Sequence, residues 1–347
     1  MKESSTQFEQ RKRDHIRIAL DPRSQTEGQS GLDSINLIHE ALPDLSLKEV
    51  ETSTSFVFRD TALPLSSPLF ISSMTAGHEK GREINEALAR LSDRRQILMG
   101  VGSQRRELDD SNAAQEWVQV RKQAPRAKLL GNIGIAQLIK TPIDQVRRLI
   151  ESTEAVALFV HLNALQEALQ PEGTTDFKNS LQAIENLVQF AGVPVIVKET
   201  GCGFSTTTLK RLEGTGVHAV DVSGLGGTHW GRVEGYRSQE QEMLYKVAQT
   251  FANWGISTLD SMANAKEASV SYEIWASGGV RNGLDAAKLL ALGAKKVGVA
   301  KPFLEAALQG DEALEMLLNQ FELELKIAMF CTGCRNLKEL QTRRVIK

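Results

Sequence analysis

The stretch Ala155-Val-Ala-Leu-Phe-Val-His-Leu-Asn-Ala-Leu-Gln-Glu167 joins an uncharged apolar run to a cluster of polar side chains. Such a run is typical of a strand buried in a parallel sheet. The polar residues that follow it therefore lie at the carboxyl end of the strand, where parallel α/β folds build their ligand sites. Any one of them alone would fit the start of a surface loop. Together they predict one wall of a site, made by His161, Asn163, Gln166 and Glu167.

Seven other short apolar runs, bounded by Gly, Pro or polar residues, have the same character. The eight expected strands cover residues 69–71, 97–101, 128–130, 156–160, 193–197, 218–222, 272–275 and 296–299. Amphipathic stretches of helical period lie between most of them, at 81–93, 142–153, 177–191, 205–213 and 284–292. Eight alternations of strand and helix predict a closed TIM (β/α)8 barrel.

The alternative architecture is a doubly wound open sheet, which has the same alternation of strand and helix. It is disfavoured because no run opens with a Gly-x-Gly-x-x-Gly turn followed by an acidic residue about twenty positions on. We therefore expect a barrel over residues 66–347, preceded by an N-terminal extension, 1–65, that packs on it. The largest insertion, 223–271, separates strands six and seven and is expected to hold helices at 239–254 and 258–268.

Composition excludes several classes of protein. The 41 Lys and Arg residues nearly balance the 43 Asp and Glu residues, so no global field recruits nucleic acid or a membrane surface. No run approaches the eighteen or so apolar residues of a membrane span, and the N-terminus lacks the apolar core of a signal peptide. Three cysteines are too few for a disulfide framework, and Cys331 and Cys334 lack a second metal-ligand pair. These features predict a cytoplasmic protein with structural cysteines.

Two glycine-rich loops follow the sixth and seventh expected strands. The loops after the last strands of such barrels commonly bind phosphate through backbone amides. The loop at 277–283 fits this role, and Arg281 would add a charged fork. The loop at 223–229 carries the hydroxyls of Ser223 and Thr228 and is expected to face the same phosphate, although its glycines would also suit a plain turn.

Cationic side chains complete the expected mouth of the barrel. Lys198 ends the fifth strand, which would place its ammonium near the low-dielectric barrel axis, where a cation stabilises developing negative charge. The cluster Arg11-Lys-Arg-Asp-His15 is ambiguous, because charged N-terminal segments are usually solvated and mobile.

Taken together, these motifs resemble type 2 isopentenyl-diphosphate isomerase, in order and nearly end to end. The matching segments are Arg11-Lys12 with His15, Met74-Thr75, Gly102-Ser-Gln-Arg105, His161-Leu-Asn163 with Gln166-Glu167, Val197-Lys-Glu199, Asp221-Val-Ser-Gly-Leu-Gly-Gly-Thr-His-Trp230 and Ser277-Gly-Gly-Val-Arg281. The departures are few: Ser73 and Ala76 stand where many relatives carry glycine, and Cys202 stands where a larger residue is common. The resemblance implies an FMN-dependent barrel that interconverts isopentenyl and dimethylallyl diphosphate with reduced flavin and Mg²⁺.

The resemblance also implies roles for individual residues. FMN would be bound by Ser72, Ser73, Met74, Thr75, Ser103, Asn132, Lys198, Ser223, Thr228, Gly278, Gly279, Arg281, Ala300 and Lys301. The diphosphate substrate would be bound by Arg11, Lys12, His15, Ser103, Gln104, Arg105, His161, Asn163 and Gln166. Glu167 would bind Mg²⁺, and the residues expected to take part in catalysis are Gln166, Lys198 and His161. The family implies NAD(P)H as reductant and a homo-oligomer, a tetramer or larger.

Two other functions remain open at this stage. An α-hydroxy-acid oxidase or dehydrogenase shares the phosphate loops and the lysine, but needs a histidine base and an arginine pair for a carboxylate. The loop at 223–229 offers His229 but no evident carboxylate clamp. The second alternative is a barrel that binds a phosphate ligand without turnover.

Overall fold

Eight parallel strands form the barrel that the alternation of apolar and amphipathic segments predicts. The computed structural model describes residues 5–75, 79–238, 242–343 and 345–346. Around the ring the strand order is β10-β9-β8-β7-β6-β5-β4-β11. Bridge pairing of Ala276 with Val297 brings the two ends of this sheet together. The strands are β4 (Leu69–Ile71), β5 (Leu98–Gly100), β6 (Lys128–Gly134), β7 (Ala157–His161), β8 (Val195–Lys198), β9 (Ala219–Asp221), β10 (Glu273–Trp275) and β11 (Val297–Val299).

Each expected strand is present, but several limits differ. The largest difference is in β6, which continues through Gly131, Asn132 and Gly134 because these residues pair with β7 up to His161. Polar and glycine residues in that segment hid its extended conformation in the sequence. β8 begins two residues later than expected, at Val195, directly after Pro194. Proline has no N–H and is tolerated only at the first residue of a central strand or before it.

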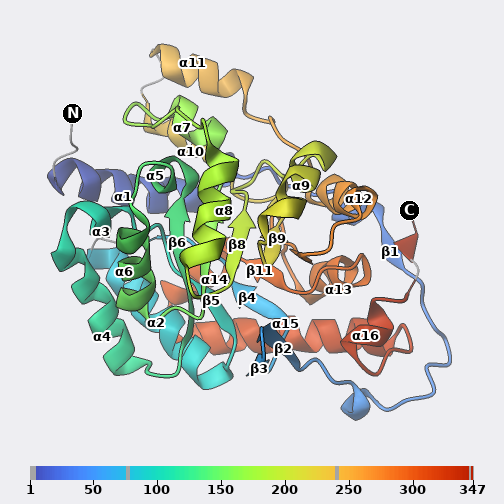
Figure 1. The fold of residues 1–347 in the computed structure, drawn as a ribbon. Helices are drawn as coiled ribbons and strands as arrows, with labels where there is room; N and C mark the ends of the chain where they lie inside the picture. The colour runs from blue at the N-terminus through green and yellow to red at the C-terminus, as the bar shows by residue number, and fades with distance from the viewer. Residues whose placement is uncertain (1–4, 76–78, 239–241, 344, 347) are drawn as a thin grey trace.

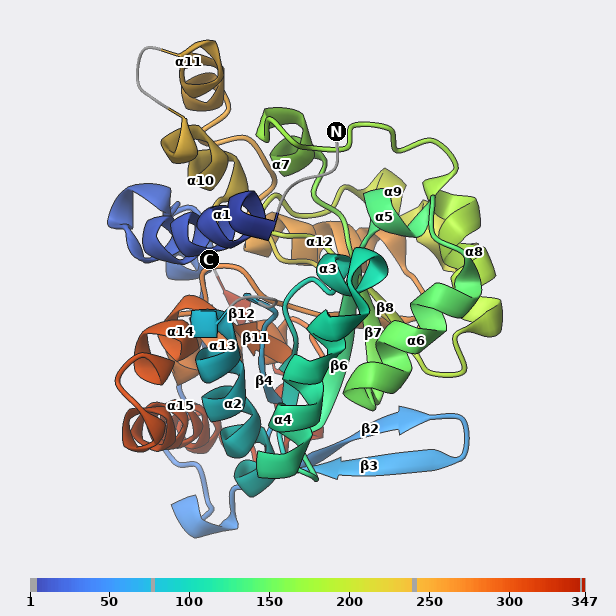
Figure 2. The ribbon, with the colours of Figure 1, turned by 90° about the vertical axis from the view of Figure 1, so that its left-hand side faces the viewer.

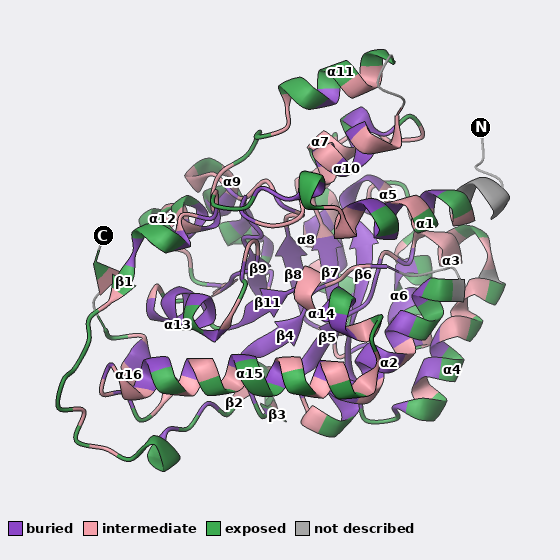
Figure 3. Cartoon of the chain, turned by 180° about the vertical axis from the view of Figure 1, so that it is seen from behind, coloured by how far each residue is buried: buried purple, intermediate pink, exposed green. Residues whose placement is uncertain are grey.

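Helices cover the outside of the barrel, as Figure 1 shows. The amphipathic segments form α2 (Glu79–Arg95), α6 (Ile143–Thr153), α8 (Ser180–Phe190), α9 (Thr206–Leu212), α12 (Thr258–Ala268) and α13 (Gly283–Ala291). The chain adds α3 (Arg105–Asp109), α4 (Gln115–Gln123), α5 (Ile135–Leu138), α7 (Ala164–Leu169), α14 (Lys301–Ala307), α15 (Asp311–Phe330) and α16 (Leu337–Leu340). The strands of the barrel are almost entirely buried while the helices alternate buried and exposed residues (Figure 3), as expected for a sheet covered on its outer face. In the described part of the chain, no helix is long and apolar enough to cross a membrane.

Aromatic side chains fill the inside of the barrel. The rings of Phe70 and Trp275 lie 5.2 Å apart, and Phe159 meets Trp275 edge-on at 6.3 Å. A hairpin of β2 (Thr54–Phe58) and β3 (Thr61–Leu65) adds Phe56, whose ring lies 5.9 Å from that of Trp275. The hairpin therefore closes the end of the barrel opposite to the loops discussed below (Figure 2).

The N-terminal extension touches both ends of the barrel. Its first element, α1 (Ser5–Leu20), lies at the carboxyl ends of the strands beside α10 (Trp230–Arg237) in both ribbon views. The chain then passes through the short helix Pro22–Ser24 before it reaches the hairpin at the other end. On the way, β1 (Asn36–Leu37) pairs with β12 (Val345–Ile346) near the C-terminus.

In its described residues, the insertion between β9 and β10 holds α10, α11 (Met243–Thr250) and α12, whereas two helices were expected. α12 has the expected limits. The expected helix at 239–254 is shorter, since α11 covers Met243–Thr250 and residues 239–241 lie outside the described residues. Helix α10 was missed because its polar and glycine residues give no apolar stripe. α10 and α11 stand over the same end of the barrel as α1 (Figure 2).

The two glycine loops pack directly on one another at this end. A Cβ atom on Gly278 would lie 2.3 Å from the carbonyl oxygen of Gly224, and one on Gly279 would lie 2.6 Å from the carbonyl group of Gly226. Both residues also have positive φ, +99° and +74°. Glycine is therefore required here for close packing as well as for backbone conformation.

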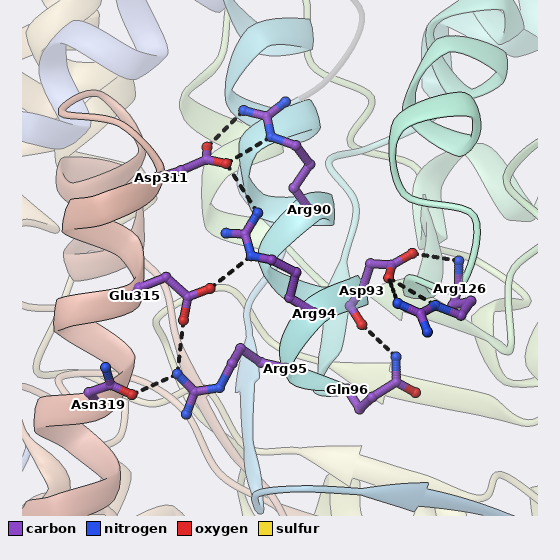
Figure 4. A network of polar contacts seen from close by, with 9 residues as sticks. All are labelled: Arg90, Asp93, Arg94, Arg95, Gln96, Arg126, Asp311, Glu315 and Asn319. Atoms are coloured by element: carbon purple, nitrogen blue, oxygen red, sulfur yellow. Dashed lines mark hydrogen bonds and ion pairs between the residues drawn. The ribbon is translucent and has the colours of Figure 1, made fainter.

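A ladder of ion pairs joins α2 to α15 on the outside of the barrel (Figure 4). Arg90 Nη2 lies 2.7 Å from Asp311 Oδ1, and Arg94 Nη1 lies 3.2 Å from Asp311 Oδ2. One turn further along, Arg94 and Arg95 both contact Glu315, at 2.9 Å each. The chain of shared partners makes this a network, which stabilises more than isolated surface pairs do.

We predict that Asp311→Asn lowers the free energy of unfolding by about 1 kcal/mol, because it removes two arginine contacts. Arg90 holds the pKa of Asp311 below its ordinary value of 3.8. The stabilisation is therefore present above that value and is lost as the pH falls through the lowered pKa. Urea unfolding at pH 7 with and without 1 M NaCl measures the effect, which salt should reduce. Asp144→Asn, also in a first helical turn but without a salt-bridge partner among the described residues, is the control. Equal losses would contradict the network.

We also predict that Gly279→Ala destabilises the protein more than Gly293→Ala. Both positions have positive φ, so both substitutions cost roughly 1 kcal/mol in backbone strain. Nothing lies within 4 Å of a Cβ on Gly293, whereas a Cβ on Gly279 meets backbone. That overlap adds about 1–3 kcal/mol. Urea unfolding of both variants tests the difference, and equal costs would show that the loops separate freely.

Candidate functional site

Two adjoining cavities open at the carboxyl ends of the strands. The first, which we call the basic cavity, has a volume of about 100 Å³ and is lined by Arg11, Lys12, His15, Ser73, Met74, Ser103, Arg105, Asn132, Gln137, His161, Asn163, Gln166, Glu167, Gln170, Lys198, Thr200 and Trp230. The second, the glycine-loop cavity, has about 230 Å³ and is lined by both glycine loops. Ser73, Lys198, Thr200 and Trp230 line both. The two cavities therefore form one continuous site.

Backbone and hydroxyl groups dominate the glycine-loop cavity. Its lining includes most of the expected cofactor residues, namely Ser72, Ser73, Lys198, Ser223, Thr228, Gly278, Gly279, Arg281, Ala300 and Lys301. Gln25 and Glu27 of the N-terminal extension also line it, which the sequence did not predict. Loops with positive φ beside hydroxyl groups are typical of anion sites that use backbone N–H donors.

Two serines in this cavity lack the partners that buried hydroxyls normally have. Ser72 Oγ and Ser73 Oγ are buried and have no hydrogen-bond partner among the residues that the structure describes. Glycines make room for them, since a Cβ on Gly298 would lie 2.4 Å from Ser72 Oγ and one on Gly100 would lie 2.5 Å from Ser73 Oγ. Buried polar atoms are usually satisfied, so unpaired hydroxyls in a cavity indicate a ligand with polar atoms. A flat heteroaromatic ring system fits this donor set.

Lys198 lies where the two cavities meet. It ends β8, is only 5% exposed, and its Nζ donates to the carbonyl oxygen of Glu199 over 2.7 Å. Burial lowers the pKa of the Lys198 ammonium, while the carboxylates of Asp221 and Glu199 oppose that shift. Burial likewise raises the pKa of Glu199 to about 7, although backbone N–H groups of Cys202 and Thr200 hold its carboxylate. A cation in so dry a place interacts strongly with any negative charge on a ligand.

His161 presents an acceptor to the basic cavity. Its Nδ1 lies 2.9 Å from Asn132 Oδ1, while Asn132 Nδ2 donates to Val101 O over 3.0 Å. In this arrangement Nδ1 carries the proton and Nε2 keeps its lone pair. Burial, together with the Lys198 charge, lowers the pKa of His161 to about 3. His161 is therefore neutral at pH 7 in the absence of an anion.

A buried carboxylate that the sequence did not single out connects α1 to the site. Glu234 on α10 accepts hydrogen bonds from His15 Nε2 at 3.0 Å and from Gln166 Nε2 at 2.9 Å, and it pairs with Arg237. Burial opposes its ionisation, but His15, Arg237 and Gln166 bring its pKa down to about 2. Glu234 thus fixes the amide of Gln166 and the ring of His15. The sequence offered one indication: Glu234 follows Trp230 by one helical turn, so the two side chains lie on the same face of a helix.

Glu167 and Asn163 offer hard oxygen atoms to the basic cavity. Glu167 accepts from Thr174 N over 2.6 Å and from Asn163 Nδ2 over 3.2 Å. The remaining atom, Asn163 Oδ1, is buried and has no hydrogen-bond partner within the described ranges of the chain. In the described part of the chain no three His, Cys, Asp or Glu side chains are grouped to hold a metal. A Mg²⁺ ion fits here if a ligand completes its shell, because Mg²⁺ commonly binds one or two carboxylates plus phosphate oxygens and water.

The side chains of two residues that were expected to bind ligands are instead bonded to other groups of the protein. Gln104 is 1% exposed and lines neither cavity; its amide donates to Leu149 O over 2.8 Å and accepts from Asn132 N over 2.9 Å. The guanidinium of Arg281 pairs with Asp33 at 2.6 Å and with Asp285 at 2.9 Å. Gln104 therefore supports the wall of the site, and the charged fork expected of Arg281 is directed at carboxylates.

An apolar recess of about 60 Å³ borders both cavities. It lies between α1 and α14, where apolar side chains pack beside Trp230, and is lined by His15, Ile16, Ala19, Ser73, Met74, Thr75, Thr228, Trp230, Ala300, Lys301 and Leu304. Trp230 lines all three spaces and meets His15 edge-on, with ring centroids 5.1 Å apart. The site thus combines an anion cradle, a cationic wall and a small apolar surface.

Comparisons with known proteins agree with this combination. A family model described as FMN-dependent dehydrogenase matches residues 14–347. Curated relatives named isopentenyl-diphosphate delta-isomerase include one from Bdellovibrio bacteriovorus, 80% identical over 347 residues and covering 100% of both chains. Another, from Legionella pneumophila strain Paris, is 52% identical and covers 99% of both, and one from Halobacterium salinarum is 44% identical, covering 98% of this chain and 93% of its own.

Solved structures of low sequence identity share the fold. A flavocytochrome b2 variant with sulfite bound has a TM-score of 0.69 at 18% identity, covering 97% of this chain and 83% of its own. A mandelate oxidase variant has a TM-score of 0.64 at 17% identity, covering 100% and 99%. Full-length identity to the isomerases, together with this barrel, places the chain in the family of FMN-dependent, type 2 isopentenyl-diphosphate delta-isomerases.

Proposed function

We propose that the protein interconverts isopentenyl diphosphate and dimethylallyl diphosphate, with reduced FMN and Mg²⁺. The observation that carries this proposal is the joining of two different cavities at Lys198. One suits a phosphate and a flat polar ring, and the other is lined by cations supplied in part by the N-terminal extension. An isomerase of a short diphosphate needs both, placed side by side.

In this proposal the glycine-loop cavity holds FMN. The phosphate would be bound by Ser223, Thr228, the backbone of Gly278 to Arg281, and Ala300 with Lys301, while the ring would contact Ser72, Ser73, Met74, Thr75, Ser103, Asn132 and Lys198. The unpaired hydroxyls of Ser72 and Ser73 support this placement. When bound and reduced, FMN would supply the acid that delivers a proton to the terminal alkene carbon and the base that removes a proton from the allylic carbon. NAD(P)H is the proposed reductant.

The substrate diphosphate would occupy the basic cavity. Its charge would be met by Arg11, Lys12 and Arg105, with Ser103, Asn163 and His161 beside it. An anion next to His161 favours the protonated ring, so substrate binding would raise the depressed pKa of that histidine. Gln104 would act from behind the wall, through its bonds to Asn132 and Leu149. Glu167 would share Mg²⁺ with diphosphate oxygens.

The remaining groups would control the alkenyl tail and the proton. Lys198 would stabilise negative charge at the junction of the cavities. Gln166, fixed by Glu234, would assist proton movement, and His15 shares the same anchor. The apolar recess would exclude water from the tail. We further propose that the protein works in the cytoplasm as a homo-oligomer, a tetramer or larger.

The geometry does not favour α-hydroxy-acid oxidation, although the solved structures of similar fold have that chemistry in their names. His229, the histidine that such a mechanism would use as base, is fully buried and lines none of the three spaces. Its Nε2 lies 3.0 Å from Trp254 O, and its Nδ1 accepts from Arg232 N. Both ring nitrogens are therefore used in the fold. A barrel that only binds a phosphate ligand is tested directly by turnover.

We predict that purified protein converts isopentenyl diphosphate to dimethylallyl diphosphate only when its FMN is reduced. The assay is anaerobic, with FMN, Mg²⁺ and NADPH, and product is followed by mass spectrometry. A parallel reaction keeps the flavin oxidised. We expect much less NADPH to be consumed than product formed, because isomerisation transfers no net electrons. Absence of product while the flavin spectrum shows reduction would refute the proposed activity, and lactate or mandelate oxidation under air would support the rival chemistry.

We predict that Glu167→Gln raises the Mg²⁺ concentration for half-maximal activity by about tenfold or more, since it removes the carboxylate charge. Glu151→Gln is the control for the loss of a carboxylate charge, because Glu151 is an exposed residue of α6 that lines none of the three spaces. Activity titrated with Mg²⁺ at saturating substrate measures both. An unchanged midpoint in Glu167→Gln, with a normal thermal unfolding curve, would exclude Glu167 as a metal ligand.

A further inference from the structure

The segment that follows α1 lies along the outer side of the glycine loop after β9. Gln25 pairs with Thr228 as an antiparallel bridge. Thr26 N donates to Gly227 O over 2.9 Å, and His229 N donates to Ser24 O over 2.9 Å. Residues 24–30, which we call the strap, therefore add a short extended edge to the loop. Nothing in the sequence of residues 1–65 indicated this contact.

Thr26 makes the densest set of contacts between the strap and the loop. Its side-chain hydroxyl donates to Gly227 O over 3.1 Å and accepts from Gly226 N over 2.8 Å. Thr26 is 2% exposed, so water does not replace these bonds. A buried N–H without an acceptor is strongly unfavourable, and Gly226 N would become one without the Thr26 hydroxyl. The side chain thus fixes the orientation of two peptide groups of the loop, the one between residues 225 and 226 and the one between residues 227 and 228.

The loop is held between two layers. On one side a Cβ on Gly226 would lie 2.4 Å from Ser30 Cβ. On the other side a Cβ on Gly227 would lie 2.9 Å from Gly279 N, in the second glycine loop. A shift of the strap therefore cannot be absorbed by the loop alone, because both of its faces are in close contact.

The strap also reaches the cavity itself. Gln25 lines the glycine-loop cavity, and its amide nitrogen lies 3.1 Å from Thr228 Oγ1, a proposed phosphate ligand. The same amide donates to Ala19 O at the end of α1 over 2.8 Å. Arg232 anchors the segment from the other side by donating to Arg23 O over 3.2 Å and to Gln25 O. The strap is thus tied to the loop, to α1 and to α10.

From these contacts we infer that the strap is part of the FMN phosphate site, with Thr26 and Gln25 as positioning residues for the loop at 223–229. This inference rests on the proposed binding of FMN in the glycine-loop cavity. It means that one continuous segment carries Arg11, Lys12 and His15 into the basic cavity and, within a few residues, holds the loop that binds the cofactor phosphate. The extension is then a cofactor-binding element as well as a substrate-binding one.

The test compares FMN with riboflavin, which has the same ring but no phosphate. Apo-protein is titrated with each, and quenching of flavin fluorescence gives both dissociation constants. Their ratio reports the contribution of the phosphate site alone. We expect Thr26→Val, which removes the hydroxyl at nearly constant volume, to weaken FMN binding about tenfold or more while riboflavin binding stays within about twofold. Thr26→Ser keeps the hydroxyl and should keep the ratio.

Two further variants make the outcome decisive. Thr215→Val is the matched control, because Thr215 is also a buried threonine whose hydroxyl bonds backbone groups, but it lines none of the three spaces. It should leave the ratio unchanged. Gln25→Leu removes the contact to Thr228 without removing the Thr26 bonds and should also lower the preference for FMN; it decides the matter if Thr26→Val does not fold.

The results separate this inference from the proposed function. A wild-type protein that binds riboflavin as tightly as FMN would refute the phosphate site itself. A wild-type preference for FMN that persists in folded Thr26→Val and in Gln25→Leu would overturn the role of the strap and leave the cofactor site intact. Loss of the preference in Thr215→Val as well would show a general effect of lost stability and would also overturn it.

Discussion

Closure of the parallel sheet is the constraint on which the rest of this structure depends. All eight strands run in one direction, so their carboxyl ends meet at one rim, and the chain must place there whatever follows each strand. Hydrogen bonds between β4 and β11, and the bridge from Ala276 to Val297, complete the ring. Once it is complete, segments as distant in sequence as Ser72 and Lys301 line the same cavity. The site is therefore a consequence of strand direction more than of any single motif.

Sequence reasoning reached the barrel because strand and helix periods are local properties. It also brought Lys198, His161 and Glu167 to one site, since Lys198 and His161 directly follow apolar runs and Glu167 belongs to the polar cluster that His161 begins. It failed where the environment of a residue depends on distant partners. Glu234 was missed because its significance lies in its contacts to His15 and Gln166, which are far away in the chain. Likewise, a motif places Gln104 near the rim but cannot show that its amide is bonded within the wall.

Burial decides which charged groups of the site are paired within the protein and which face the cavity. The protein has almost no net charge, yet the lining of the basic cavity holds Arg11, Lys12, Arg105 and Lys198 against the carboxylate of Glu167, and neighbouring carboxylates have partners of their own. Glu234 is paired with Arg237, Asp221 accepts from Ser277 Oγ at 2.9 Å, and Asp285 holds Arg281. Each buried carboxylate has donors that offset its desolvation. Lys12, Lys198 and the neutral ring of His161 consequently line the basic cavity, where they can stabilise a bound anion.

The contacts of the N-terminal extension show that it does not move independently of the barrel. A helix that only closed over substrate would need few contacts at its far end. Here the backbone of the segment after α1 is hydrogen-bonded to Gly227, and its side chains are hydrogen-bonded to Gly226 and Thr228. The buried N–H of Gly226 has the Thr26 hydroxyl as its acceptor. Rearranging α1 without disturbing the loop would require the few residues between Leu20 and Gln25 to absorb the motion. Arg232 anchors that stretch on carbonyl groups. The proposed substrate and cofactor sites are therefore mechanically joined through the extension.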